Sequence, residues 1–170
     1  MRTIAAIAVA SVVLAAPAFT QEPAKPGPEH AVLQKMEGIW DSTLKAGGME
    51  NKGTMTYKME LGGLWLVGSL ETELGGQKFF GKGLDSYDPV KKKYVGYWFD
   101  SMSATPLKME GSYDKEKKTL TMVGEGPGQD GKTAKWQSVS TMPDDDTINM
   151  SMYVGDGKDP MFTVTYKRKK

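Results

Sequence analysis

The sequence predicts an all-β protein, an antiparallel up-and-down β-barrel of about ten strands with a short N-terminal helix. Three observations support this: apolar and polar residues alternate along several segments, turn-forming residues recur between them, and one hairpin sequence occurs twice. The two copies are residues 87–94, YDPVKKKY, and residues 113–120, YDKEKKTL, which begin 26 positions apart. In each copy an aspartate, whose carboxylate can accept backbone N–H groups just ahead, begins a tight turn. The chain is therefore expected to fold as a run of hairpins.

The first 18 residues have the features of a secretory signal peptide. Arg2 gives a positive start, residues 4–16 are apolar, and residues 16–18, Ala-Pro-Ala, form a small-residue cleavage site. Cleavage after Thr20 is one alternative, and an uncleaved N-terminal anchor is another. The apolar run is too short for a membrane span, and no later stretch is apolar enough. The mature protein is therefore expected in the periplasm or outside the cell.

The segment after the signal peptide divides into a linker and one domain. Residues 19–27 are rich in proline, alanine and lysine and are expected to form a flexible linker. A single domain is expected over residues 28–170. Pro28 followed by Glu29 favours the start of a short helix, which Gly38 ends.

From Gly38 onward the hydrophobic pattern has a period of two, which indicates strands with one buried face. Residues 54–61, 107–113 and 148–154 show it most clearly. Turn signals that divide this region into about ten strands are residues 47–48, 62–63, 75–76, 88–92, 103–106, 114–118, 127–131, 143–146 and 155–158. A sheet of this size curls, and hairpin follows hairpin without the long crossovers of a sandwich. A closed barrel is therefore preferred to a sandwich.

The composition excludes several classes of function. Without the signal peptide the chain has 21 basic and 21 acidic side chains, so neither nucleic acid nor an anionic membrane is an expected partner. The absence of cysteine excludes disulfides, thiol catalysis and lipoprotein acylation. His30 is the single histidine and lies at the helix start, so no metal site, cofactor or Ser-His-Asp triad is predicted.

Candidate ligand-binding residues follow from the parity of the strands. The predicted inner face is rich in methionine and aromatic residues, and flexible, polarisable methionines suit a cavity for an apolar ligand. Ordinary core filling is the alternative for each methionine. The proposed ligand contacts are Trp40, Tyr57, Met59, Trp98, Asp100, Met109, Met122, Trp136 and Met152.

The segment 94–102 carries aromatic residues on both faces, so both faces are expected to make contacts. Trp98 and Asp100 share one face. If that face points inward, Asp100 is a carboxylate in an apolar barrel, which needs a partner or takes a raised pKa. Alternatively, Asp100 ends the strand and caps a turn over residues 101–106.

Several short pieces, taken in order, cover nearly the whole mature chain. They are residues 28–30, 38–40, 61–66, 83, 87–88, 93–102 and 111–114. Together they resemble a bacterial family of uncharacterised proteins, the domain of unknown function numbered 1579. Residues 38–40, Gly-Ile-Trp, also resemble the start of lipocalins. The resemblance implies a calycin-like, lipocalin-like β-barrel and no established activity, so it assigns no catalytic residue.

Three functions remain open. The preferred one is binding of a small, largely apolar ligand inside the barrel, with Asp100 as its polar contact, because barrels of this strand number can hold a small ligand. The second is a structural or interaction protein whose barrel is filled by side chains. The third is an enzyme that uses a buried acid such as Asp100 for proton transfer.

Overall fold

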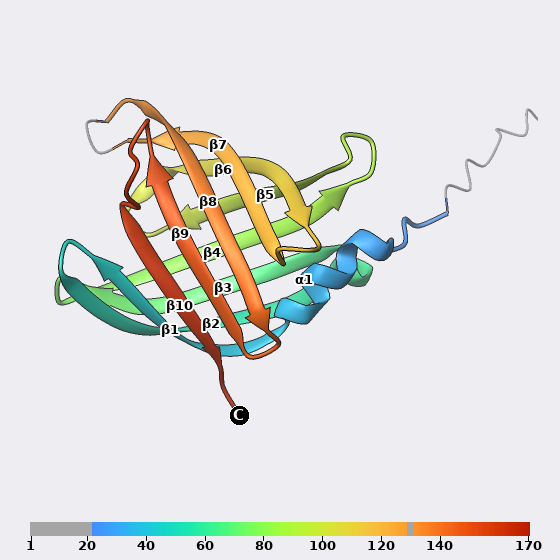
Figure 1. The fold of residues 1–170 in the computed structure, drawn as a ribbon, viewed down its shortest axis with the longest axis horizontal. Helices are drawn as coiled ribbons and strands as arrows, with labels where there is room; N and C mark the ends of the chain where they lie inside the picture. Colours follow the sequence, from blue (N-terminus) through green and yellow to red (C-terminus); the bar gives the residue numbers. More distant parts are fainter. Residues whose placement is uncertain (1–21, 129–130) are drawn as a thin grey trace, which may run out of the picture.

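A computed structural model describes residues 22–128 and 131–170. The predicted signal peptide and the first residues of the predicted linker lie outside this part of the chain. The described residues form ten antiparallel strands that close into one barrel (Figure 1). Each strand pairs with its neighbours in sequence, and β1 pairs with β10 to close the barrel. The predicted up-and-down barrel with a short N-terminal helix is confirmed.

The elements of the described chain follow one another along a continuous meander. The helical elements are η1 (Pro28–His30), α1 (Ala31–Met36) and η2 (Leu61–Gly63). The strands are β1 (Gly38–Ala46), β2 (Met49–Glu60), β3 (Trp65–Leu74), β4 (Gln77–Asp88), β5 (Lys93–Asp100), β6 (Ser103–Asp114), β7 (Thr119–Pro127), β8 (Thr133–Asp144), β9 (Thr147–Val154) and β10 (Phe162–Arg168). Within the described ranges, no helix has the length and apolar character needed to cross a membrane.

The barrel has two different ends. Helix α1 lies across the end where β1 begins and β10 finishes, which we call the helix end (Figure 1). The opposite end, here the far end, carries the turns after β1, β3, β5, β7 and β9. The described chain beyond Arg168 leaves the barrel at the helix end.

The repeated Tyr-Asp sequence forms two equivalent hairpin turns at the helix end. Asp88 Oδ1 accepts the backbone N–H groups two and three residues ahead, at 2.9 and 3.0 Å. Asp114 Oδ1 makes the same two contacts, both at 3.0 Å. Lys92 and Lys118 close the two turns with φ of 55° and 49°. The expected role of both aspartates as turn formers is confirmed.

One predicted turn is wrong. Residues 103–106 belong to β6, and the turn after β5 contains only residues 101 and 102. The prediction gave Pro106 too much weight, because proline usually breaks a strand. Here the pairing of β5 and β6 shifts between Trp98 and Asp100, and Pro106 lies opposite this irregular stretch. A proline there removes no regular ladder hydrogen bond.

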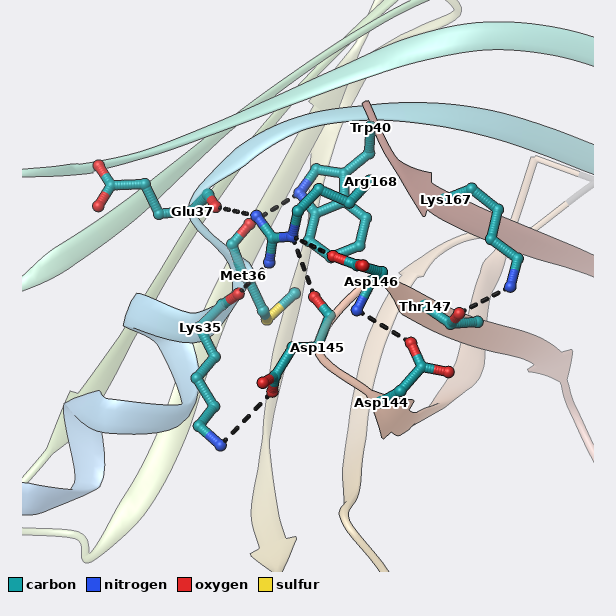
Figure 2. Close-up of polar contacts among 10 residues, drawn as sticks. All are labelled: Lys35, Met36, Glu37, Trp40, Asp144, Asp145, Asp146, Thr147, Lys167 and Arg168. Atoms are coloured by element: carbon teal, nitrogen blue, oxygen red, sulfur yellow. Dashed lines mark hydrogen bonds and ion pairs between the residues drawn. The ribbon is translucent and has the colours of Figure 1, made fainter. Parts of the chain in front are cut away.

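Arg168, near the C-terminus, joins α1 to the barrel wall (Figure 2). Its guanidinium lies 4.1 Å from the centre of the Trp40 ring. It donates to the Lys35 carbonyl at 2.7 Å and to the Glu37 carbonyl at 2.6 Å, and pairs with Asp146 at 3.2 Å. The last carbonyls of a helix have no hydrogen-bond donor within the helix, and Arg168 supplies donors to two carbonyls at the end of α1.

Trp40 closes the barrel below this arginine. Its side chain is 1% exposed, and its indole N–H donates to the Met36 carbonyl at 2.8 Å. Val32, Leu33 and Met36 bury the apolar face of α1 against the same end. Apolar side chains of α1 and β1 therefore pack together at the helix end.

His30 fixes the start of the helical segment. It is 4% exposed, its Nδ1 accepts the Gly27 N–H at 3.1 Å, and its ring meets Tyr87 edge-on at 6.4 Å. Tyr94 donates its hydroxyl to the Glu29 carbonyl at 2.8 Å beside it. Both contacts hold the segment against β4 and β5.

Candidate functional site

The inner face of the barrel contains all nine residues proposed from the sequence. Directly paired residues of an antiparallel sheet point to the same side, and deeply buried members such as Leu66 and Val164 identify the inner side. The inward positions include Trp40, Tyr57, Met59, Trp98, Asp100, Met109, Met122, Trp136 and Met152. The apolar parity read from the sequence is therefore the parity that faces the barrel interior.

The nine residues are spread along the barrel and do not form a single site. Trp40 and Met59 lie toward the helix end, where Trp40 packs with α1. Trp98 and Asp100 lie toward the far end of β5, and Trp136 lies toward the far end of β8.

Asp100 sits at the end of β5 and stabilises the turn that follows. Its Oδ1 accepts the Met102 N–H at 2.9 Å, and its Oδ2 accepts the Trp98 indole N–H at 3.0 Å. Both oxygens therefore have protein partners. Of the two alternatives for this residue, the structure supports turn capping, with the Trp98 contact in addition.

Asp85 of β4 is a second carboxylate on the inner face of the barrel, and it was missing from the predicted residues. Its strand partners are Leu66 of β3 and Gly96 of β5. Leu66 is 0% exposed, whereas Asp85 keeps part of its surface within reach of water. No group of the described chain donates a hydrogen bond to this carboxyl. An enclosed carboxyl that has no partner and that water can still touch must adjoin a space that a water molecule can enter.

Two tyrosines from other strands face the same region. Tyr57 of β2 and Tyr166 of β10 meet edge-on with their ring centres 6.5 Å apart. Burial is the main cause that raises the pKa of both phenols, and the charge of Asp85 raises them further. Like Asp85, Tyr57 is only partly buried although it points inward. The three side chains thus bring three polar groups together in an apolar interior.

The ionisation of Asp85 is strongly perturbed. Burial raises the pKa of its carboxyl to about 7, because the protein interior solvates a negative charge less well than water does. Perturbed carboxyls of this kind concentrate at functional sites. At neutral pH this group can exist in both protonation states, and so can act as donor or as acceptor.

Glycines on neighbouring strands make room for these side chains. A Cβ atom at Gly96 would lie 2.5 Å from Asp85 Oδ1 and 3.3 Å from the methyl group of Met122. A Cβ atom at Gly68 would lie 2.8 Å from the ring of Tyr57. The aspartate and the tyrosine therefore lie over bare backbone, which only glycine provides.

Two tryptophans lie toward the far end of the same interior. The Trp98 indole lies against the backbone of Gly81, where a Cβ would overlap the ring. Trp136 is paired with Gly124 and Val154, and its indole N–H is buried with no hydrogen-bond partner. A buried unpaired donor costs free energy. Among the described residues, no three acidic or histidine side chains gather as a metal site would require.

The inward position of Asp85 could have been predicted from its spacing to Tyr87, although not from an alternation of apolar residues. The inward residues of β4 include Gly81, Gly83, Asp85 and Tyr87, so this strand shows no apolar stripe. Counting back by twos from the tyrosine of the Tyr-Asp turn would have placed Asp85 on the inner face. Tyr166 could have been found in the same way, from the alternation of residues 162–166.

Comparison with known proteins identifies the family of this chain. The family model of a protein of unknown function, DUF1579, matches residues 25–168. No protein of curated function matches the sequence. A redesigned β-barrel has a TM-score of 0.47 and 15% identity, covering 82% of this chain and 96% of its own. A de novo designed fluorescence-activating β-barrel has a TM-score of 0.48 and 14% identity, covering 81% and 97%. Both are likenesses of fold alone. From its match over nearly all of the described residues, the chain belongs to the DUF1579 family.

Proposed function

We propose that this protein is exported and that its barrel binds a small, largely apolar molecule beside Asp85. The observation that carries the proposal is the state of two inward-pointing side chains, Asp85 and Tyr57. Both remain within reach of water, and neither has a hydrogen-bond partner among the described residues. A barrel filled by side chains would instead seal such groups or pair them.

The lining around these groups supports an apolar ligand. Met109 and Met122 are 8% and 6% exposed, and they lie on the inner faces of β6 and β7. Methionine adapts its shape to irregular partners, and a few polar groups within an apolar wall are the usual composition of a small-molecule site. In this proposal Asp85 replaces Asp100 as the polar contact, because both oxygens of Asp100 are already occupied.

The binding proposal is tested by titrating the mature protein with N-phenyl-1-naphthylamine, a neutral probe whose fluorescence rises in apolar surroundings. Saturable binding and quenching of the protein's tryptophan emission are the expected results. Native mass spectrometry of the freshly purified protein would also reveal a ligand retained from the cell. A protein that carries no ligand and gives no saturable signal has a filled barrel, and the proposal is then wrong.

A matched pair of variants locates the binding region. Gly83 faces the interior, where its Cβ would lie 3.6 Å from the Trp98 ring and 3.7 Å from Asp85 Oδ2. Gly83→Leu should fill this space and abolish probe binding. Lys82→Leu adds the same side chain one residue away on the exposed outer face and should leave binding unchanged. Equal loss in both variants would place the probe elsewhere.

Export is tested separately. The full chain, expressed in a bacterium, should appear in the osmotic-shock fraction with its first 18 or 20 residues removed, as measured by intact mass. Retention of the full-length mass in the cytoplasm would contradict this part of the proposal.

A further inference from the structure

The barrel interior contains an acid that no cation faces. Among the inward positions of the described strands, the basic side chain is Arg168, and its guanidinium is held by Trp40 and the carbonyls of the helix end. Among the described residues, the Asp85 carboxyl is thus enclosed without a counter-ion and without a hydrogen-bond donor. An unpaired acid inside a protein weakens the fold, so its presence requires an explanation outside stability.

The surroundings of Asp85 suit a positive charge in particular. Oδ1 lies over Gly96, and Oδ2 lies near the position that a Cβ of Gly83 would take. The hydroxyls of Tyr57 and Tyr166 are near enough to interact electrostatically with the carboxylate, and they have no donors from the described protein. A primary ammonium group has three N–H donors, and here it would find one carboxylate and two hydroxyl oxygens as acceptors. Aromatic rings beside it would add further attraction.

We propose that the barrel selects apolar molecules that carry a single protonated amine, and that this amine pairs with Asp85. The inference rests on the proposed binding function and names the chemical class of its ligand. The apolar part of the ligand lies among the methionines and Trp98, and the ammonium group supplies the counter-ion that Asp85 lacks among the described residues. A carboxylate ligand of the same shape is repelled, and an alcohol gains a hydrogen bond but no charge pairing.

The pairing makes binding depend on pH. The titratable groups that face Asp85 are Tyr57 of β2 and Tyr166 of β10, while the adjacent positions are Leu66 on β3 and Gly96 on β5. Both tyrosines stay neutral near pH 7, because their pKa is raised. The empty barrel therefore binds a protonated amine less well below the pKa of Asp85, where the carboxyl holds a proton. With a pKa of about 7, affinity should be about tenfold weaker at pH 6 than at pH 8.

The proposal is tested by calorimetric titration at pH 8 with three probes, each built on a naphthalene ring: the amine 1-naphthylmethylamine, the alcohol 1-naphthylmethanol and the carboxylate 1-naphthaleneacetate. The mature protein should bind the amine at least about tenfold more tightly than the alcohol, which corresponds to about 1.4 kcal/mol. The acetate should bind most weakly. Asp85→Asn should lose the preference for the amine, so that its affinities for the amine and the alcohol lie within about twofold of each other, because the amide has nearly the same shape but carries no charge.

The outcomes separate this inference from the binding function beneath it. Equal affinity for amine and alcohol, or an amine preference that survives in Asp85→Asn, overturns the inference while leaving apolar binding intact. Failure of all three probes and of N-phenyl-1-naphthylamine overturns both. Circular dichroism and urea unfolding establish that Asp85→Asn is folded, and the removal of a buried charge should leave it at least as stable as the natural protein.

Discussion

Arg168 and Trp40 at the helix end have protein partners for their polar groups, whereas Asp85 and Tyr57 in the interior have none among the described residues. At the helix end, Arg168 reaches three backbone carbonyls and one carboxylate, and the Trp40 indole N–H has its own acceptor. Around Asp85, a carboxyl and the Tyr57 hydroxyl have no partner in the described chain, yet water can reach both residues. The contacts of the first region stabilise the fold. The second region has polar groups that the described residues leave without a partner.

The largest effect is expected from Trp40→Ala. Trp40 is 1% exposed, so its removal leaves a cavity and deprives the Met36 carbonyl of its donor. The free energy of unfolding should fall by about 3–5 kcal/mol, measured by urea denaturation. A loss below 1 kcal/mol would show that the helix end does not hold the fold together.

Arg168→Ala should cause the second largest loss of stability, because it removes the contacts that join α1 to the barrel wall. Hydrogen bonds to a charged donor are worth about 1.5–3 kcal/mol, and the arginine side chain is partly exposed, so a loss of about 2–3 kcal/mol is expected. Arg168→Lys should recover only a small part, because an ammonium cannot match the planar fork of the guanidinium. Under conditions where the variants are folded, the affinity for an interior probe should stay unchanged. A change in affinity with full stability would contradict the division between the two regions.

The pH dependence of stability in Asp85→Asn tests whether the Asp85 carboxyl is enclosed. Between about pH 4 and about pH 7 the unfolded chain has lost the Asp85 proton while the folded protein keeps it. The contribution of Asp85 to stability therefore falls as pH rises through this window, and it stays at the lower value above pH 7. The variant should be about 2 kcal/mol more stable than the natural protein at pH 8 and equally stable near pH 4. If the variant and the natural protein differed by the same free energy of unfolding at both pH values, the carboxyl would not be enclosed.

A pair of glycine variants probes the space beside the carboxyl. Gly96→Ala should shift Asp85 and cost about 1–2 kcal/mol, because the new methyl group would lie 2.5 Å from Oδ1. Gly83→Ala makes only contacts of 3.6 Å or longer, so its stability should be equal or slightly higher. Equal costs would mean that the interior relaxes freely around this strand pair.

The smallest effects are expected at the repeated turn. Asp88→Ala and Asp114→Ala each remove an acceptor for two backbone N–H groups at an exposed hairpin. Each should lower the thermal midpoint slightly and by a similar amount, and the double variant should show the sum of the two shifts. A large shift in either variant alone would show that the two turns are not equivalent.

The sequence predicted the fold well because the evidence for it is local. The alternation, the turn residues and the repeated Tyr-Asp hairpin each involve only a few neighbouring residues. Together they indicated consecutive hairpins that close into a barrel. Arg168 was not predicted, because its role depends on β10 closing against β1 and bringing it to Trp40. The candidate site was predicted only in part. Parity placed the methionines and tryptophans on the inner face, but β4 lacks an apolar stripe, so Asp85 was missed.

If Asp85 lies in an enclosed space that a ligand can enter, a carbon-13 NMR titration of its side-chain carboxyl should report both the enclosure and the bound ligand. In the mature protein alone, the carboxyl should titrate with a midpoint near pH 7. With saturating 1-naphthylmethylamine the midpoint should move downward, because a nearby cation favours the charged carboxylate. A midpoint near that of ordinary aspartate in the free protein, or one that a bound amine leaves in place, would contradict the account.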